Sequence, residues 1–128
     1  MSKTALVLIA HGSRDPDWAV PFDNVCSAVH AMAPDLRVEL AFLEFMAPTL
    51  LESAELLLSE GFEHIVVLPM FIAQGAHLKE DVPRLINEIR ERNPKASFEL
   101  ASALGDSETI VQAMAAHVIT QAGQFSPA

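Results

Sequence analysis

The chain has 128 residues, of which 51% are hydrophobic and 20% are charged, and its formal net charge is -9. This composition is typical of one globular domain, which we expect over residues 1–128 with a disordered tail over residues 123–128. The negative charge disfavours a nucleic-acid partner and an anionic membrane surface, since both require clustered Lys and Arg. No apolar run is long enough to span a bilayer. A single cysteine, Cys26, leaves no internal disulfide, so we expect a cytoplasmic protein.

Short apolar runs alternate with amphipathic stretches, which is typical of a parallel sheet with helical crossovers. The first strand is expected over residues 4–10, and its aliphatic character predicts a central strand covered on both faces. A helix follows it, with Pro21 near the first turn and Pro34 at the end. The second strand, residues 37–43, alternates apolar and polar residues, as a half-exposed edge strand does.

The middle of the chain carries clear start and stop signals. Thr49 and Glu52 have the spacing of a capping box, and Gly61 is a suitable stop for the helix that this box begins. The third strand is expected over residues 65–68, which are fully apolar and predict another central strand. A loop over residues 70–76 follows.

In the last third of the chain, Asp81 is expected to cap a helix that has Pro83 in its first turn. A weak fourth strand is expected over residues 97–101. Asp106 is then expected to cap a final helix that runs to about Gln121. The residues expected to face inward from this final helix are Ile110, Met114 and Ile119.

These elements predict an α/β fold. With right-handed crossovers, they form a four-stranded parallel doubly wound sheet of order 2-1-3-4, with helices on both faces. In such a sheet, ligands bind in the crevice beyond the carboxyl ends of the strands.

Two histidines follow the two central strands. His11 comes directly after the first strand, and His77 follows the third strand after a short loop. Neutral imidazole is both a base and the commonest metal ligand in proteins. Glu44 follows the second strand, and two imidazoles with one carboxylate suit a divalent first-row metal. The alternatives are a His11 that bonds to backbone, a solvent-exposed His77 at a helix start and a surface Glu44.

Other side chains at the same edge are candidates for contact with a ligand. Ser13 and Arg14 follow His11, and Lys79 follows His77. The two cations could hold an anionic substrate, although solvated side chains are a simple alternative. Met70 and Phe71 are interpreted as pocket lining or core.

Several motifs are absent. The chain has no G-x-x-x-x-G-K loop, no G-x-G-x-x-G after its first strand and no G-x-S-x-G elbow, so nucleotide binding and serine hydrolysis are poorly supported. Histidine phosphatases also place a His-Gly pair after their first strand, but they have an arginine immediately before that histidine, where this chain has Ala10, so phosphoryl transfer through a nucleophilic His11 is a weaker alternative. A non-catalytic metal or tetrapyrrole carrier requires the same ligands as a metal-inserting enzyme and stays open.

Together these residues carry a resemblance to a known family. The ordered set consists of His11-Gly12-Ser13-Arg14-Asp15-Pro16, Glu44-Phe45, Pro69-Met70-Phe71, Gly75-Ala76-His77 and Asp81-Val82-Pro83. With this set the chain resembles the class II tetrapyrrole chelatases, in particular the short CbiX-type sirohydrochlorin cobaltochelatases.

The resemblance implies ATP-independent insertion of a divalent metal, usually Co²⁺, into sirohydrochlorin in cobalamin biosynthesis, with Fe²⁺ or Ni²⁺ as alternatives. It implies no cofactor beyond this substrate metal. His11 and His77 are then the metal-binding and proton-accepting pair, and Glu44 is an acidic metal ligand. Longer relatives contain two such halves, so the resemblance also implies a homodimer with a cleft between two copies.

Overall fold

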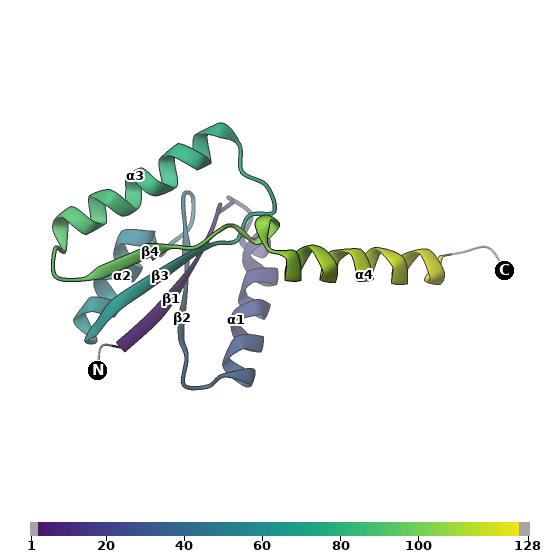
Figure 1. Ribbon diagram of the computed structural model, residues 1–128, viewed down its shortest axis with the longest axis horizontal. Coiled ribbons are helices and arrows are strands. Elements are labelled where there is room, and N and C mark those ends of the chain that lie inside the picture. Colours follow the sequence, from purple (N-terminus) through teal and green to yellow (C-terminus); the bar gives the residue numbers. More distant parts are fainter. Residues whose placement is uncertain (1–2, 126–128) are drawn as a thin grey trace.

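The computed structural model describes residues 3–125 and contains one four-stranded parallel sheet (Figure 1). The strand order is β2-β1-β3-β4, which confirms the predicted fold class and the central position of two apolar strands. Two central strands need cover on both faces, whereas the edge strands need less. The strands are β1 (Lys3–Ala10), β2 (Arg37–Phe42), β3 (Phe62–Pro69) and β4 (Ser97–Leu100).

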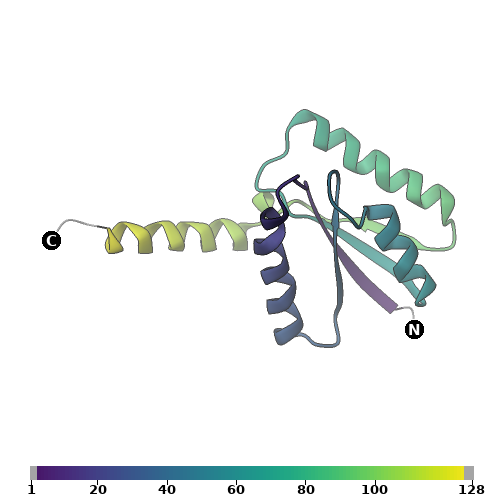
Figure 2. The same ribbon diagram turned by 180° about the vertical axis from the view of Figure 1, so that it is seen from behind.

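The helices are distributed unequally around this sheet. One face is covered by α2 and α3, whose apolar side chains join the main core, and α1 packs on the other face. The helix α4 projects away from the sheet in both views (Figures 1 and 2). The bounds are η1 (Pro16–Ala19), α1 (Val20–Met32), α2 (Leu50–Ser59), α3 (Ala76–Arg92), η2 (Leu104–Asp106) and α4 (Glu108–Gln124), where η marks a 3-10 helix.

The two faces of the sheet differ in burial. Ala5, Val7 and Ile65 point toward α2 and α3 and are 0% exposed. On the opposite face a smaller cluster forms where α1 and η1 meet β2, with Trp18 against Phe42. The main core therefore lies between the sheet and the α2–α3 layer.

The capping box predicted at the start of α2 is confirmed. The Thr49 Oγ1 accepts a hydrogen bond from the Glu52 N–H at 3.2 Å, and the Glu52 carboxylate accepts one from the Thr49 N–H at 3.0 Å. The bond from the Thr49 N–H favours the ionised carboxylate and, together with the Thr49 side chain, lowers the pKa of Glu52. Gly61, with a φ of 95°, follows the end of α2 as predicted.

The predicted start of the third helix is wrong. The helix α3 begins at Ala76, with Gly75 at the N-cap, so Asp81 and Pro83 lie inside it. The reason is tertiary burial, because Leu78 and Val82 extend the buried stripe of α3 toward its N-terminus. This apolar contact outweighs the hydrogen bond that a proline inside a helix removes.

The prediction for the last helix also needs correction. Asp106 lies in η2, Ser107 precedes α4, and α4 includes Gly123 of the predicted tail; residues 126–128 lie outside the described part of the chain. Ile110, Met114 and Ile119 are not buried, and Ile119 is 72% exposed, because α4 does not reach the sheet. Despite this apolar character, no helix within residues 3–125 is both long and apolar enough to cross a membrane.

Candidate functional site

His11 and Glu44 meet because the pairing of β1 with β2 continues past the ends of both strands. The Leu43 N–H donates to the Ala10 carbonyl at 3.0 Å, and the Glu44 N–H donates to the His11 carbonyl at 3.1 Å. The two side chains consequently leave neighbouring chain segments at one edge of the sheet. The His11 Nε2 lies 3.6 Å from the Glu44 Oε1, and both side chains are about half exposed.

Gly12 is required for this approach. Its φ is 98°, a conformation that costs an L side chain free energy, and a Cβ at this position would lie 1.8 Å from the Glu44 carbonyl oxygen. Only glycine therefore lets the segment after β1 lie against the segment after β2. The sequence indicated a sharp turn or a close approach here, and the structure shows that the Glu44 backbone is what comes close.

The spacing of His11 and Glu44 suits one shared divalent ion. The His11 Nε2 and the Glu44 Oε1 are 3.6 Å apart. With an ion about 2.1 Å from each of them, the angle between the two ligand atoms at the ion would be roughly 120°. Glu44 also lines a cavity of about 320 Å³ between the end of β2 and α3, where Asp81 and Glu88 add negative charge and Arg84 adds positive charge. The site thus offers a nitrogen and an oxygen ligand with open positions around them.

His77 does not join this pair in the single chain. It lies exposed in the first turn of α3, two residues after the N-cap Gly75. Within residues 3–125, no group of three or more His, Cys, Asp or Glu side chains could hold a metal ion. The structure therefore brings together His11 and Glu44, and a role for His77 stays a prediction.

The ring of Phe71 contacts the ring of His11. The two ring centroids are 6.1 Å apart at an interplanar angle of 64°, which is an edge-on contact. Phe71 is only 7% exposed and belongs to the main core. Phe71 is therefore a core residue whose ring also contacts that of His11, and a role in lining a ligand pocket stays a prediction.

Phe45 is a residue to which the sequence assigned no role. It has a φ of 67°, which is unusual for a bulky residue, and its side chain is 57% exposed. The Arg14 guanidinium lies 4.8 Å from the centroid of its ring. Strained, exposed residues of this kind cluster at functional sites. The available sequence signal was an aromatic residue directly after the candidate ligand Glu44.

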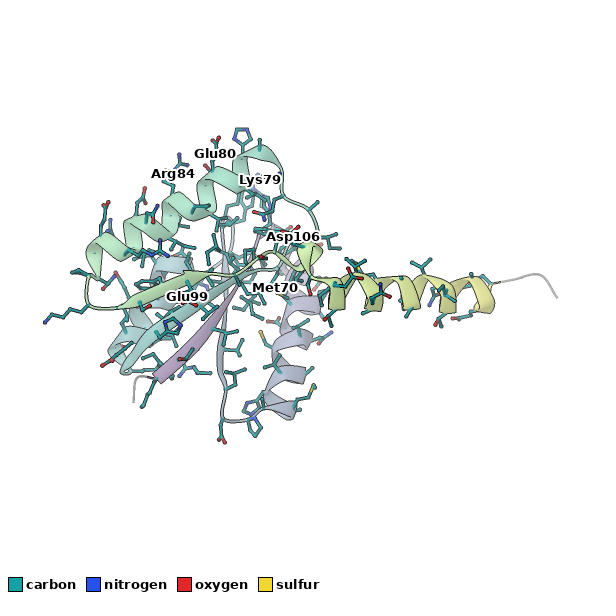
Figure 3. All side chains as sticks on the ribbon, in the orientation of Figure 1. Met70, Lys79, Glu80, Arg84, Glu99 and Asp106 are labelled. Atoms are coloured by element: carbon teal, nitrogen blue, oxygen red, sulfur yellow. The ribbon has the colours of Figure 1, made fainter. Side chains whose placement is uncertain are left out.

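The remaining candidates lie around this edge in different ways. The Ser13 Oγ accepts a hydrogen bond from the Asp15 N–H at 3.1 Å, and the Met70 N–H donates to the Ile9 carbonyl at 2.8 Å. Lys79 lines a cavity of about 280 Å³ on the β4 side of α3, as does Asp106 (Figure 3). Lys79 therefore faces a different part of the rim from Arg14.

A cavity of about 550 Å³ lies at the amino end of β2, away from the strand ends that carry His11 and Glu44. Cys26 and His30 of α1 line it. Burial raises the pKa of the Cys26 thiol, and the carboxylates of Asp23 and Glu39 raise it further. This favours the protonated thiol, whereas a metal ligand must be a thiolate.

Gly105, in the segment before α4, packs against the loop that follows β3. The Gly105 N–H donates to the Phe71 carbonyl at 3.1 Å, and a Cβ on Gly105 would lie 1.5 Å from the Ile72 carbonyl oxygen. This close packing fixes the loop from which Phe71 reaches His11. The sequence contained no signal for it beyond the glycine itself.

We expect Gly105→Ala to lower the free energy of unfolding by about 2 kcal/mol, because the clash separates η2 from the loop and breaks the Phe71 bond. Gly75→Ala is the matched control, since a Cβ there meets nothing within 4 Å. Urea unfolding followed by circular dichroism measures both variants. Equal stability of the two would contradict the expected contact.

The family model CbiX matches residues 5–121 of this chain. A sirohydrochlorin cobaltochelatase of Saccharolobus solfataricus is 32% identical over 122 residues, which cover 88% of this chain and 91% of the relative. A CbiX protein of cobalamin (vitamin B12) biosynthesis from Marinobacter aquaeolei VT8 has a similar fold, with a TM-score of 0.83, 24% identity and coverage of 94% of this chain and 98% of that one.

A longer solved structure matches over only part of its length. The sirohydrochlorin chelatase SirB from Bacillus subtilis subspecies spizizenii, in complex with cobalt, has a TM-score of 0.78 and 26% identity. The match covers 92% of this chain but 50% of SirB. Three findings agree: the family model matches most of the chain, the relative from Saccharolobus solfataricus has a similar length, and the fold is shared. The chain belongs to the CbiX family.

Proposed function

We propose that this chain inserts a divalent metal ion, Co²⁺ in the first place, into sirohydrochlorin without ATP. The observation that carries the proposal is the His11–Glu44 pair, 3.6 Å apart at the sheet edge of a CbiX-family chain. The 32% identity to a sirohydrochlorin cobaltochelatase supports the same reaction. A cytoplasmic location is part of the proposal and rests on the single cysteine.

The proposed reaction exchanges one metal ion for two protons. His11 and Glu44 hold the partly dehydrated ion, and the macrocycle approaches from the open side of the pair. As the ion passes to two pyrrole nitrogens, each of them loses its N–H proton. The His11 imidazole, now released from the ion, accepts one proton, a second neutral imidazole accepts the other, and both protons are then released to water. We assign His77 the second proton-accepting and metal-binding role, as the family resemblance implies.

The macrocycle contacts are assigned to side chains around this pair. Phe45 offers an exposed ring for stacking on a flat ligand, and Arg14, which lies over that ring, can bind a carboxylate of the substrate. Met70 and Phe71 supply apolar contacts, and Ser13 supplies a hydroxyl. Lys79 attracts carboxylates from the β4 side, which offsets part of the net charge of -9.

We further propose that the working unit is a homodimer. The chain matches nearly the full length of the Saccharolobus solfataricus relative but half of SirB. In a homodimer, two copies of this short chain would together form the cleft that a longer chain forms between its two halves. His77 would then act across such a cleft, because it does not reach His11 and Glu44 as a third ligand in one copy.

Absorption spectroscopy of the purified chain with sirohydrochlorin and Co²⁺, in the absence of ATP, tests the activity. We expect many metal insertions per chain, above the rate without protein. A spectral change that stops at one equivalent would instead identify a carrier. Parallel assays with Ni²⁺ and Fe²⁺ rank the metals, and the SirB structure from Bacillus subtilis with Fe³⁺ makes iron the first comparison.

A further inference from the structure

The orientation of the His11 ring is not set by a hydrogen bond. Within residues 3–125 the ring forms none with another protein group, and its Nε2 lies 3.6 Å from the Glu44 Oε1, which is too far for one. The side chain is also 48% exposed. A metal-binding histidine is commonly oriented by a hydrogen bond from its other ring nitrogen, and a side chain without such support samples several staggered rotamers. The orientation of His11 therefore depends on packing.

Phe71 lies beside His11 because the pairing of β1 with β3 continues past the ends of both strands. Ile9 pairs with Pro69 in the sheet, and the Met70 N–H donates to the Ile9 carbonyl at 2.8 Å. Two residues after this pair, the rings of His11 and Phe71 meet edge-on, with centroids 6.1 Å apart and an interplanar angle of 64°. The imidazole thus has a carboxylate on its β2 side and an aromatic ring on its β3 side.

Phe71 is itself held in place from two sides. Its side chain is 7% exposed and belongs to the main core, where close packing restricts rotation of a side chain. Its carbonyl accepts a hydrogen bond from the Gly105 N–H at 3.1 Å, and Gly105 also packs directly on the Ile72 carbonyl. The Phe71 ring is therefore a fixed surface, against which the half-exposed His11 ring rests.

We propose that Phe71 is a positioning residue for metal insertion, because its ring holds the His11 imidazole in the orientation that places Nε2 beside the Glu44 carboxylate. An edge-on contact between two rings favours this orientation about 2–10-fold over orientations without the contact. The inference rests on the proposed function, since it takes His11 as a metal ligand. Phe71 acts here through His11 and touches neither the ion nor the transferred protons.

The alternative is a Phe71 that only fills the core, and Phe98 provides the matched control for it. Phe98 is 6% exposed and belongs to the same main core. It pairs with Ile65 inside β3, whereas Phe71 follows the end of that strand, beside His11. Phe71→Leu and Phe98→Leu therefore remove the same atoms from the same core, and only the first removes a ring that contacts His11.

The first test is a calorimetric titration of the chain with Co²⁺ alone. Phe71→Leu is expected to weaken Co²⁺ binding about 5-fold, because the His11 ring then leaves the orientation beside Glu44 for part of the time. Phe98→Leu should keep the wild-type affinity, although urea unfolding should show a similar loss of stability in both variants. An unchanged affinity in Phe71→Leu, or an equal loss of affinity in Phe98→Leu, would overturn the proposal.

The second test observes the orientation of His11 directly, in the metal-free protein. The three-bond couplings between its Hα and Hβ protons, measured by NMR, report whether the side chain keeps one χ1 rotamer or averages over several. We expect the couplings of one rotamer in the wild type and in Phe98→Leu, and averaged couplings in Phe71→Leu. Averaged couplings in the wild type would overturn the proposal even if Phe71→Leu did not fold.

Steady-state kinetics separate this role from a contact of Phe71 with the macrocycle. For Phe71→Leu we expect a rise in the KM for Co²⁺ and little change in the KM for sirohydrochlorin, and the opposite pattern would overturn the positioning role. The titration and the NMR measurement need no turnover. The expected variant behaviour in a chain that inserts no cobalt would therefore remove the proposed activity and leave the role of Phe71 standing, whereas an active wild type with an unaffected Phe71→Leu variant would do the reverse.

Discussion

Replacement of His11 by alanine is expected to lower kcat/KM for cobalt insertion roughly 100-fold or more. The substitution removes the nitrogen ligand that faces the Glu44 carboxylate at 3.6 Å, and it removes a proton acceptor at the same position. The measurement is the initial rate of the sirohydrochlorin spectral change with Co²⁺, together with a calorimetric titration of the chain with Co²⁺ alone. Both the rate and the metal affinity should fall.

Two further variants show whether the effect depends on the pair. Glu44→Gln keeps the size of the side chain but removes its charge, so we expect losses of roughly 10–100-fold in metal affinity. His30→Ala on α1 is the control, because His30 is exposed at the amino end of β2 and should leave both quantities unchanged. A His11→Ala variant with the wild-type rate and cobalt affinity would refute the assigned site.

Gly12→Ala is expected to cost about 3 kcal/mol of unfolding free energy and to weaken cobalt binding. A left-handed conformation costs an alanine about 1 kcal/mol, and the methyl group at 1.8 Å from the Glu44 carbonyl oxygen must push the two segments apart. Two backbone hydrogen bonds between the segments then weaken, at about 1 kcal/mol each. Because the same movement separates His11 from Glu44, stability and metal affinity should fall together.

Gly61→Ala separates the two causes of the loss expected for Gly12→Ala, which are the left-handed backbone conformation and the clash with Glu44. Gly61 has a similar φ of 95°, but a Cβ there meets nothing within 4 Å. We therefore expect a loss of only about 1 kcal/mol and normal cobalt affinity. Urea unfolding and calorimetry of the two variants give the comparison, and equal losses would show that the approach of Gly12 to Glu44 does not matter.

The parallel sheet, its strand order and the α2 cap were predictable from the sequence because they depend on local patterns. An aliphatic run such as residues 4–10 indicates a buried strand wherever it occurs, and Thr49 with Glu52 needs only its own turn to form a capping box. Right-handed crossovers then restrict the order of the strands. The edge of the sheet that carries His11, Glu44 and the loop before His77 follows from the same rules.

Contacts that join distant segments were decided by the tertiary structure alone. The pairing of Glu44 with His11 depends on the register of β2 against β1 and on the space beside Gly12, and burial of Leu78 and Val82 outweighs Pro83 at the start of α3. The packing of Gly105 on Ile72, in the segment just before α4, is a contact of the same kind. Sequence patterns report the preference of each segment, whereas these features depend on which atoms another segment places beside it.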